Sequence, residues 1–238
     1  MSCVEQYRQQ TESFVSVCHS LAANMYVTAH GGNLAWKLDE NLLLVTPTRL
    51  NKGEVGPDDV VFVDAEGNKV EGGREPTGEL PMYLNFFRQR PDVVSVIHCH
   101  PPMTGAFAIM KGPNWLMRPV FPETVTEVGP VPVVPYGEPL TQRLADNFTP
   151  LLDKYNAFLM ENHGLVIMSP RDITWTRMMV ELLEMTSAAL LPALAAGEVK
   201  EISKEDVANL DNVMKTRGLP MFGAPGVNSS LVDVYFSV

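Results

Sequence analysis

The chain has 238 residues, of which 45% are hydrophobic and 19% are charged, enough apolar material for a full core. Eighteen Lys and Arg against 28 Asp and Glu give a net charge of −10, so the overall field repels nucleic acids and anionic membrane surfaces. The three cysteines form no CxxC pair, and the first residues lack the apolar segment of a secretion signal. We therefore expect a cytoplasmic protein with no nucleic-acid and no membrane partner.

Apolar spacing in the first part of the chain predicts a helix followed by two hairpins. Apolar residues recur three and four positions apart over residues 5–26, which is typical of an amphipathic helix. The short apolar runs 34–38 and 42–46 predict one hairpin, and the runs 60–64 and 69–71 predict a second. Both hairpins indicate an antiparallel sheet.

Helices and strands alternate in the remainder of the chain. The predicted helices cover residues 79–90, 103–110, 139–155, 169–191 with Ser169 as N-cap, and 203–217. The predicted strands cover residues 93–98, 130–134, 157–160 and 164–168, and the tail from residue 220 is expected to be irregular. We expect a single α/β domain over residues 1–238, with a mostly antiparallel sheet and helices on both of its faces.

Three histidines are candidate metal ligands. His98 and His100 end an apolar strand, where residues two apart project to the same face, so both imidazoles can reach one ion while Cys99 points away. His163 lies between two apolar runs, beside Gly164. Three imidazoles with one open position are typical of a catalytic zinc site. An isolated HxH pair is more often fortuitous, and a histidine before glycine is more often a turn residue.

Glu79 is a candidate metal ligand or proton carrier. It begins a predicted helix, where a carboxylate also commonly serves only to complement the helix dipole. Thr77 and Gly78 precede that helix and offer a hydroxyl and free N–H groups to an anion.

Two further polar turns could bind an anion. The Asn33 amide, the Thr48 hydroxyl and the Arg49 guanidinium follow or precede apolar strands, and Arg binds carboxylate or phosphate through two parallel hydrogen bonds. The alternative interpretation is that both segments are simply tight connections.

Seven short motifs occur in one order along the chain. They are Gly-Asn at 32–33, Thr-Pro-Thr at 46–48, Pro-Thr-Gly-Glu at 76–79, Arg-Pro-Asp-Val at 90–93, His-x-His-Pro at 98–101, Pro-Tyr-Gly at 135–137 and Asn-His-Gly at 162–164. Together they resemble the class II aldolase and adducin-head family. The resemblance implies a three-layer α/β/α fold, a C4 homotetramer with sites at subunit interfaces, and a role in carbohydrate metabolism.

The same resemblance implies roles for the candidate residues. It implies a divalent ion, usually Zn²⁺ with Co²⁺ or Mn²⁺ as options, on His98, His100 and His163. It implies Glu79 as a ligand of the resting metal and as the catalytic acid and base. The positions that match the family's anion cradle are Asn33, Thr48, Arg49, Thr77 and Gly78.

Several positions depart from the aldolase pattern, among them Thr77 and Gly78, where the family has two serines. Arg49 stands where the family has glycine, and Phe121 and Arg217 fall near the positions of two family tyrosines, so the proton donor is unassigned. The first hypothesis is a metal-dependent, class II aldolase-type C–C lyase that cleaves a small, phosphorylated hydroxy-oxo sugar or sugar acid through a metal-stabilised enediolate. The alternative is a metal-dependent decarboxylase of an anionic oxo acid. A non-catalytic, adducin-like interaction module is disfavoured because every candidate ligand is present.

Overall fold

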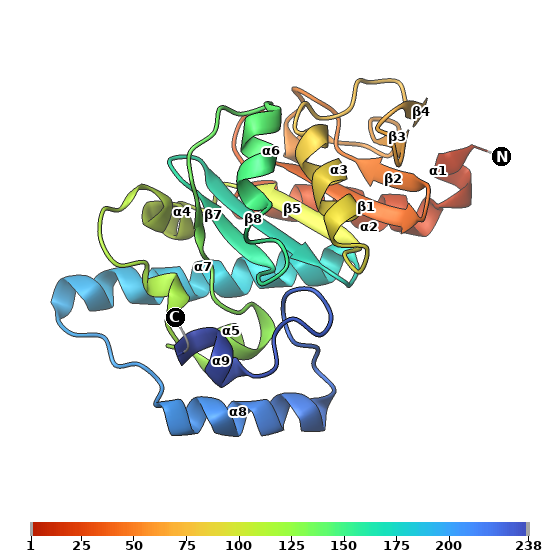
Figure 1. Ribbon diagram of the computed structural model, residues 1–238. Coiled ribbons are helices and arrows are strands. Elements are labelled where there is room, and N and C mark those ends of the chain that lie inside the picture. Colours follow the sequence, from red (N-terminus) through yellow and green to blue (C-terminus); the bar gives the residue numbers. More distant parts are fainter. Residues whose placement is uncertain (1, 237–238) are drawn as a thin grey trace.

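An eight-stranded sheet forms the centre of the structure, a computed structural model that describes residues 2–236 (Figure 1). Its strand order is β4-β3-β2-β1-β5-β8-β7-β6, and all neighbouring strands are antiparallel except β6 and β7. The strands are β1 Asn33–Asp39, β2 Leu42–Val45, β3 Val61–Asp64, β4 Lys69–Glu71, β5 Ser95–Cys99, β6 Val133–Val134, β7 Ala157–Met160 and β8 Gly164–Ser169. The expectation of a mostly antiparallel sheet is confirmed.

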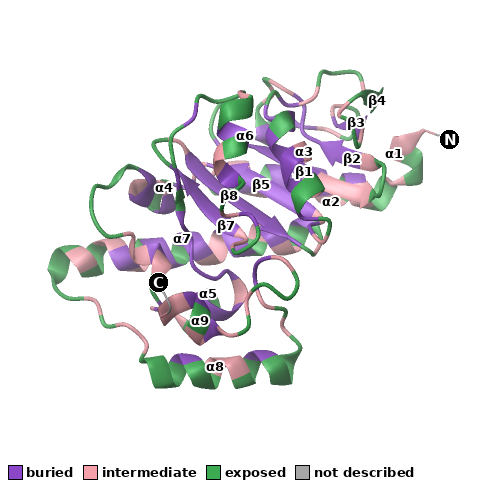
Figure 2. Cartoon of the chain, in the orientation of Figure 1, coloured by how far each residue is buried: buried purple, intermediate pink, exposed green. Residues whose placement is uncertain are grey.

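Helices cover both faces of this sheet. The helices on one face are α3 Leu80–Gln89 and α6 Gln142–Phe148, and those on the other are α2 Arg8–Ala23, α4 Pro102–Ile109 and α7 Ile173–Ala196. Successive strand residues point to opposite faces, so Leu34 and Leu44 join the apolar cluster under α2 and α7, whereas Ala35 and Val45 join the cluster under α3. Figure 2 shows the strands buried between these helix layers. The three-layer α/β/α fold is confirmed.

A third apolar cluster lies apart from the sheet. It joins α5 Pro122–Glu127, α8 Lys204–Arg217 and α9 Leu231–Phe236, which lie beyond α7 in Figure 1. The remaining short helices are α1 Cys3–Gln6, η1 Lys52–Glu54 and η2 Trp115–Met117. The buried Arg90, which follows α3, connects the segment between α8 and α9 to the rest of the fold. Its guanidinium donates to the Gly223 carbonyl oxygen in that segment at 2.8 Å and forms an ion pair with Asp92 at 2.7 Å.

Several predicted helix boundaries were wrong. Ser169 still belongs to β8, and α7 is capped three residues later by Asp172, whose carboxylate accepts from the Trp175 N–H at 2.9 Å. α6 covers only part of the expected range 139–155 and is followed by turns, because Pro150 directly follows its C-cap Thr149 and has no backbone N–H to continue the helix. α5 and α9 were not predicted.

The helix α7 is long and apolar enough to cross a membrane by length and composition alone. It packs instead against β5, β8, α2 and α4. Its buried Glu184 accepts hydrogen bonds from the Met103 and Thr104 N–H groups at 2.9 and 2.8 Å, which caps the start of α4. These contacts identify α7 as a core helix.

Candidate active site

The three candidate histidines converge at one end of the central strands. His98 lies in β5, His100 directly follows β5, and His163 lies in the turn between β7 and β8. β5 pairs with β8, with His98 opposite Val166, and this pairing brings the turn beside the strand end. One ligand nitrogen from each ring lies within 4.8 Å of the others. The three side chains can therefore bind a single metal ion.

Hydrogen bonding sets the orientation of the His98 ring. Its Nδ1 atom lies 3.0 Å from the Leu165 carbonyl oxygen, which can only accept, so Nδ1 carries the proton. The other ring nitrogen, Nε2, faces the other histidines and lies 3.1 Å from the Nε2 atom of His100. A metal-binding histidine is commonly held by such a bond from its second nitrogen.

Burial keeps two of the rings neutral. It lowers the pKa of His100 to about 3 and that of His163 to about 4, and the charge of the neighbouring His98 ring lowers both further. At neutral pH both imidazoles therefore offer lone pairs without first losing a proton.

Two glycines beside the histidines are closely packed against their neighbours. A Cβ atom on Gly164 would lie 2.5 Å from Cδ2 of His100 and 2.7 Å from the Cys99 carbonyl oxygen. Gly32 has a φ of +66°, and a Cβ atom there would lie 2.4 Å from Cγ1 of Val27. Neither position has room for a side chain, so both glycines are required by the local packing.

Glu79 faces the histidines although it occupies the N-cap position of α3. Its carboxylate makes no capping bond to the helix and is 5% exposed. Its Oε2 atom lies 3.5 Å from Nε2 of His98, and its Oε1 atom lies 3.9 Å from Nε2 of His163. Asn33 Nδ2 donates to Oε2 at 2.8 Å. The site thus offers three imidazoles and one carboxylate, a donor set that suits zinc and related divalent ions.

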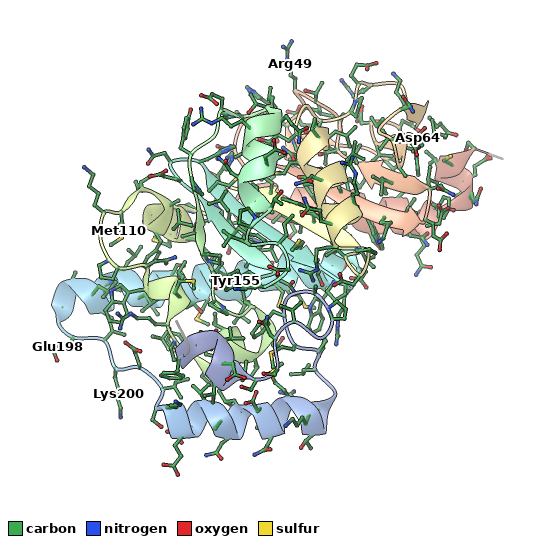
Figure 3. The ribbon with its side chains drawn as sticks, viewed as in Figure 1. Arg49, Asp64, Met110, Tyr155, Glu198 and Lys200 are labelled. Carbon is green, nitrogen blue, oxygen red and sulfur yellow. The ribbon has the colours of Figure 1, made fainter. Side chains whose placement is uncertain are left out.

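All of the predicted site residues line one cavity of about 330 Å³, namely Asn33, Thr48, Arg49, Thr77, Gly78, Glu79, His98, His100 and His163. Arg49 differs from the other eight residues, because its side chain is exposed and extends into solvent (Figure 3). Its φ of +56° is unusual for a residue other than glycine. Phe121 and Arg217 do not line the cavity: Phe121 caps α5, and Arg217 ends α8.

Sequence reasoning missed a lysine at this cavity. Lys52 is 1% exposed, lines the cavity, and its ammonium donates to the carbonyl oxygens of Leu50 at 2.8 Å and His30 at 3.3 Å. Burial lowers the pKa of Lys52, and the nearby Glu79 carboxylate opposes this shift only in part. The only sequence signal was a basic residue four positions after Thr48, in the same turn.

Known proteins share this fold and much of this sequence. The model of the class II aldolase and adducin N-terminal domain matches residues 12–191. A 3-oxo-tetronate 4-phosphate decarboxylase of Pectobacterium atrosepticum is 32% identical over 78% of this chain and 84% of its own length. An L-fuculose phosphate aldolase of Methanococcus maripaludis is 30% identical over 72% of this chain and 90% of its own.

A solved structure agrees with the sequence comparisons. A Klebsiella pneumoniae protein, described only as an aldolase, epimerase or decarboxylase, superposes with a TM-score of 0.78 at 30% identity, over 85% of this chain and 98% of its own. The resemblance drawn from seven short motifs is thereby confirmed. The chain belongs to the class II aldolase and adducin family.

Proposed function

We propose that this chain is a metal-dependent C–C lyase that decarboxylates a small phosphorylated 3-oxo acid. The observation behind the proposal is the convergence of Glu79 with His98, His100 and His163 on the wall of one cavity. These four residues would hold a divalent ion, with Zn²⁺ as the first choice. When bound, the ion supplies Lewis-acid stabilisation of the negative charge that an enediolate carries after a C–C bond breaks.

The chain's own residues would orient the substrate and move the proton. Thr48, Thr77 and Gly78 line the same cavity, and the two hydroxyl groups would donate to the phosphate. The N–H groups on either side of Gly78 are already bonded, to the Thr46 carbonyl oxygen and to the Thr77 hydroxyl. The buried Lys52 adds a basic group to the wall of the same cavity. Glu79, buried beside the histidines, would take a proton from water and pass it to the carbon that loses carbon dioxide.

The missing tyrosines favour decarboxylation over aldol cleavage. In aldol cleavage, one hydroxyl group of the substrate loses its proton and becomes the carbonyl group of the aldehyde product. A protein group must take that proton, and in the reverse reaction it must give the proton back. Loss of carbon dioxide leaves the bonding electrons on carbon and transfers no proton to the leaving group. No tyrosine is found among the described residues that line the cavity, and Phe121 falls near the position of the family's tyrosine acid. Similarity to the Pectobacterium decarboxylase supports the same choice and suggests a four-carbon 3-oxo acid 4-phosphate.

Aldol cleavage of a ketose 1-phosphate, the first hypothesis from the sequence, becomes the second candidate. It is supported by similarity to the Methanococcus aldolase and by the enediolate that both reactions share. The C4 homotetramer and the cytoplasmic location stay predictions.

The two reactions are separated by their products. The metal-loaded protein is incubated with a panel of 3-oxo acid phosphates and ketose 1-phosphates while carbon dioxide and aldehyde are both measured. We expect carbon dioxide from a 3-oxo acid phosphate and none with the Glu79→Gln variant. Release of only an aldehyde and a ketone phosphate would overturn decarboxylation in favour of the aldolase. Absence of both products with every substrate would contradict a lyase of either kind.

A further inference from the structure

A buried hydrogen-bond chain continues from the candidate site into the core. Tyr83 lies one helical turn after Glu79 in α3 and is fully buried in the apolar cluster between α3 and the sheet. Its hydroxyl lies 2.7 Å from the main-chain carbonyl oxygen of Asn33 and also contacts the Oδ1 atom of the same residue. Asn33 in turn donates from Nδ2 to Glu79. One asparagine thus links two residues of the same helix.

This arrangement determines which way the Asn33 amide faces. An amide has an acceptor oxygen and a donor nitrogen, and a carboxylate can only accept. With Oδ1 held by the Tyr83 hydroxyl, Nδ2 must face Oε2 of Glu79, at the observed 2.8 Å. The opposite orientation would place Oδ1 against the carboxylate and leave two buried acceptors facing each other.

The backbone positions Asn33 for this role. In the pairing of β1 with β5, Asn33 lies directly opposite His98. The preceding Gly32 can approach β5 because it lacks Cβ, which would lie 2.9 Å from the His98 carbonyl oxygen. The hydrogen-bond chain therefore meets the Glu79 carboxylate on the side next to the first candidate ligand, His98, 3.5 Å away.

We infer that Tyr83 is a positioning residue that, through Asn33, holds the Glu79 carboxylate in its orientation toward the three histidines. The inference rests on the metal centre of the proposed function and adds a residue outside the cavity to it. We call the part of the cavity formed by Glu79 and the three histidines the metal end. Asn33 then has a role at the metal end, distinct from the anion binding expected from the sequence. Burial and the charge of Glu79 raise the pKa of Tyr83 well above its usual value, so its hydroxyl keeps the proton that it donates.

The Tyr83→Phe variant tests this inference because it removes the hydroxyl and keeps the buried ring. Metal affinity of the metal-free protein is measured by competition with a chromogenic chelator, and the Co²⁺ form is examined by visible absorption. We expect metal binding to weaken about 10- to 100-fold, as for other residues that orient a ligand, and the Co²⁺ spectrum to change. The matched control is Tyr7→Phe, which loses a surface bond of 2.9 Å to Asp39 and should leave both readouts unchanged.

A double-mutant cycle shows whether the effect passes through Asn33. Asn33→Ala should weaken metal binding at least as much as Tyr83→Phe, and the double variant should match Asn33→Ala alone. Asn33→Ala keeps the Tyr83 ring in the core, so it tests the link to Glu79 even if Tyr83→Phe fails to fold. Unchanged metal affinity in Asn33→Ala would overturn the inference.

Three results would be decisive against parts of this account. Wild-type affinity and spectrum in Tyr83→Phe would overturn the role of Tyr83 while leaving the metal centre in place. Additive losses in the double variant would show that Tyr83 acts by a route other than Asn33 and would overturn the inference. A wild-type protein that binds no divalent ion would contradict the proposed function itself.

Discussion

The two ends of the cavity are built differently. At the metal end, Asn33, Glu79 and His98 are all less than 10% exposed, and hydrogen bonds from β1, α3 and β8 hold them. At the anion end, Thr77 and Lys52 are also buried, but Thr48 and Arg49 lie in a turn, and the Arg49 side chain points into solvent. The difference suggests that the fold fixes the bond-breaking chemistry, whereas the turn determines which anionic substrate is accepted.

The largest expected effect is at the metal end. Removing the most buried ligand with His98→Ala should abolish stoichiometric metal binding and reduce activity by more than about 100-fold, the upper range for residues that merely orient a ligand. Elemental analysis of the purified variant measures the metal content. Full retention of the ion would show that the metal end is not organised around His98.

Gly164→Ala tests how tightly the rings are packed. The new Cβ atom would overlap His100 and the Cys99 carbonyl, so we expect about 10- to 100-fold weaker metal binding and a loss of about 1–3 kcal/mol in the free energy of unfolding. The matched control is Gly105→Ala in α4, where a Cβ atom meets no neighbour. Equal metal affinity in both variants would mean that the ring position tolerates displacement.

Lys52→Met tests the anion end separately. Loss of the buried charge should weaken binding of inorganic phosphate about tenfold, roughly 1.4 kcal/mol, and should change the metal dissociation constant less, although Lys52 also interacts with the charge of Glu79. Isothermal titration calorimetry measures both. The control is Lys69→Met, which removes an exposed lysine of β4 that forms an ion pair with Glu75. A larger effect on metal than on phosphate would contradict the division of the cavity into two ends.

The pH dependence of stability follows from the depressed pKa values of the metal end. His100 and His163 titrate at about 3 and about 4 in the folded chain, against 6.5 for an ordinary histidine. Below pH 6.5 the unfolded chain therefore binds more protons, so the stability of the metal-free protein should fall as the pH decreases from 7 to 4. Urea unfolding at several pH values checks this. The His100→Gln variant should show a weaker dependence, and an unchanged profile would contradict burial as the cause.

The smallest effect is expected at Arg49. Glycine adopts the positive φ of this position without strain, so Arg49→Gly should raise the free energy of unfolding by about 1 kcal/mol. It should also weaken binding of a doubly charged anion by about two- to fivefold, as expected for an exposed charge pair. Urea unfolding and anion titration measure the two changes. Lower stability in the glycine variant would show that the Arg49 side chain has a structural contact.

Local patterns predicted most of the sheet and the candidate ligands. Short apolar runs identified the strands, and two-residue spacing placed His98 and His100 on one face, because both signals depend on neighbours in sequence. Helix boundaries were less predictable. Ser169 and Asp172 are both good N-caps, and only the pairing of β8 with β5 decides between them.

Long-range contacts explain what the sequence could not reveal. The hydroxyl of Tyr83 meets Asn33 from fifty positions away, and the Lys52 ammonium bonds to His30 across another turn. The seven ordered motifs were enough to identify the family. The role of each residue at the anion end depends on the direction of its side chain, which the motifs do not specify. Arg49 illustrates this, because it lines the cavity while its guanidinium lies outside.

The most direct test of the central claim is a metal titration of the chelator-treated, dialysed protein with activity followed in parallel. We predict that activity is lost with the metal and returns in proportion to added Zn²⁺, reaching its maximum at one ion per chain. Full activity in the metal-free protein, or no saturable binding of a divalent ion, would contradict the account.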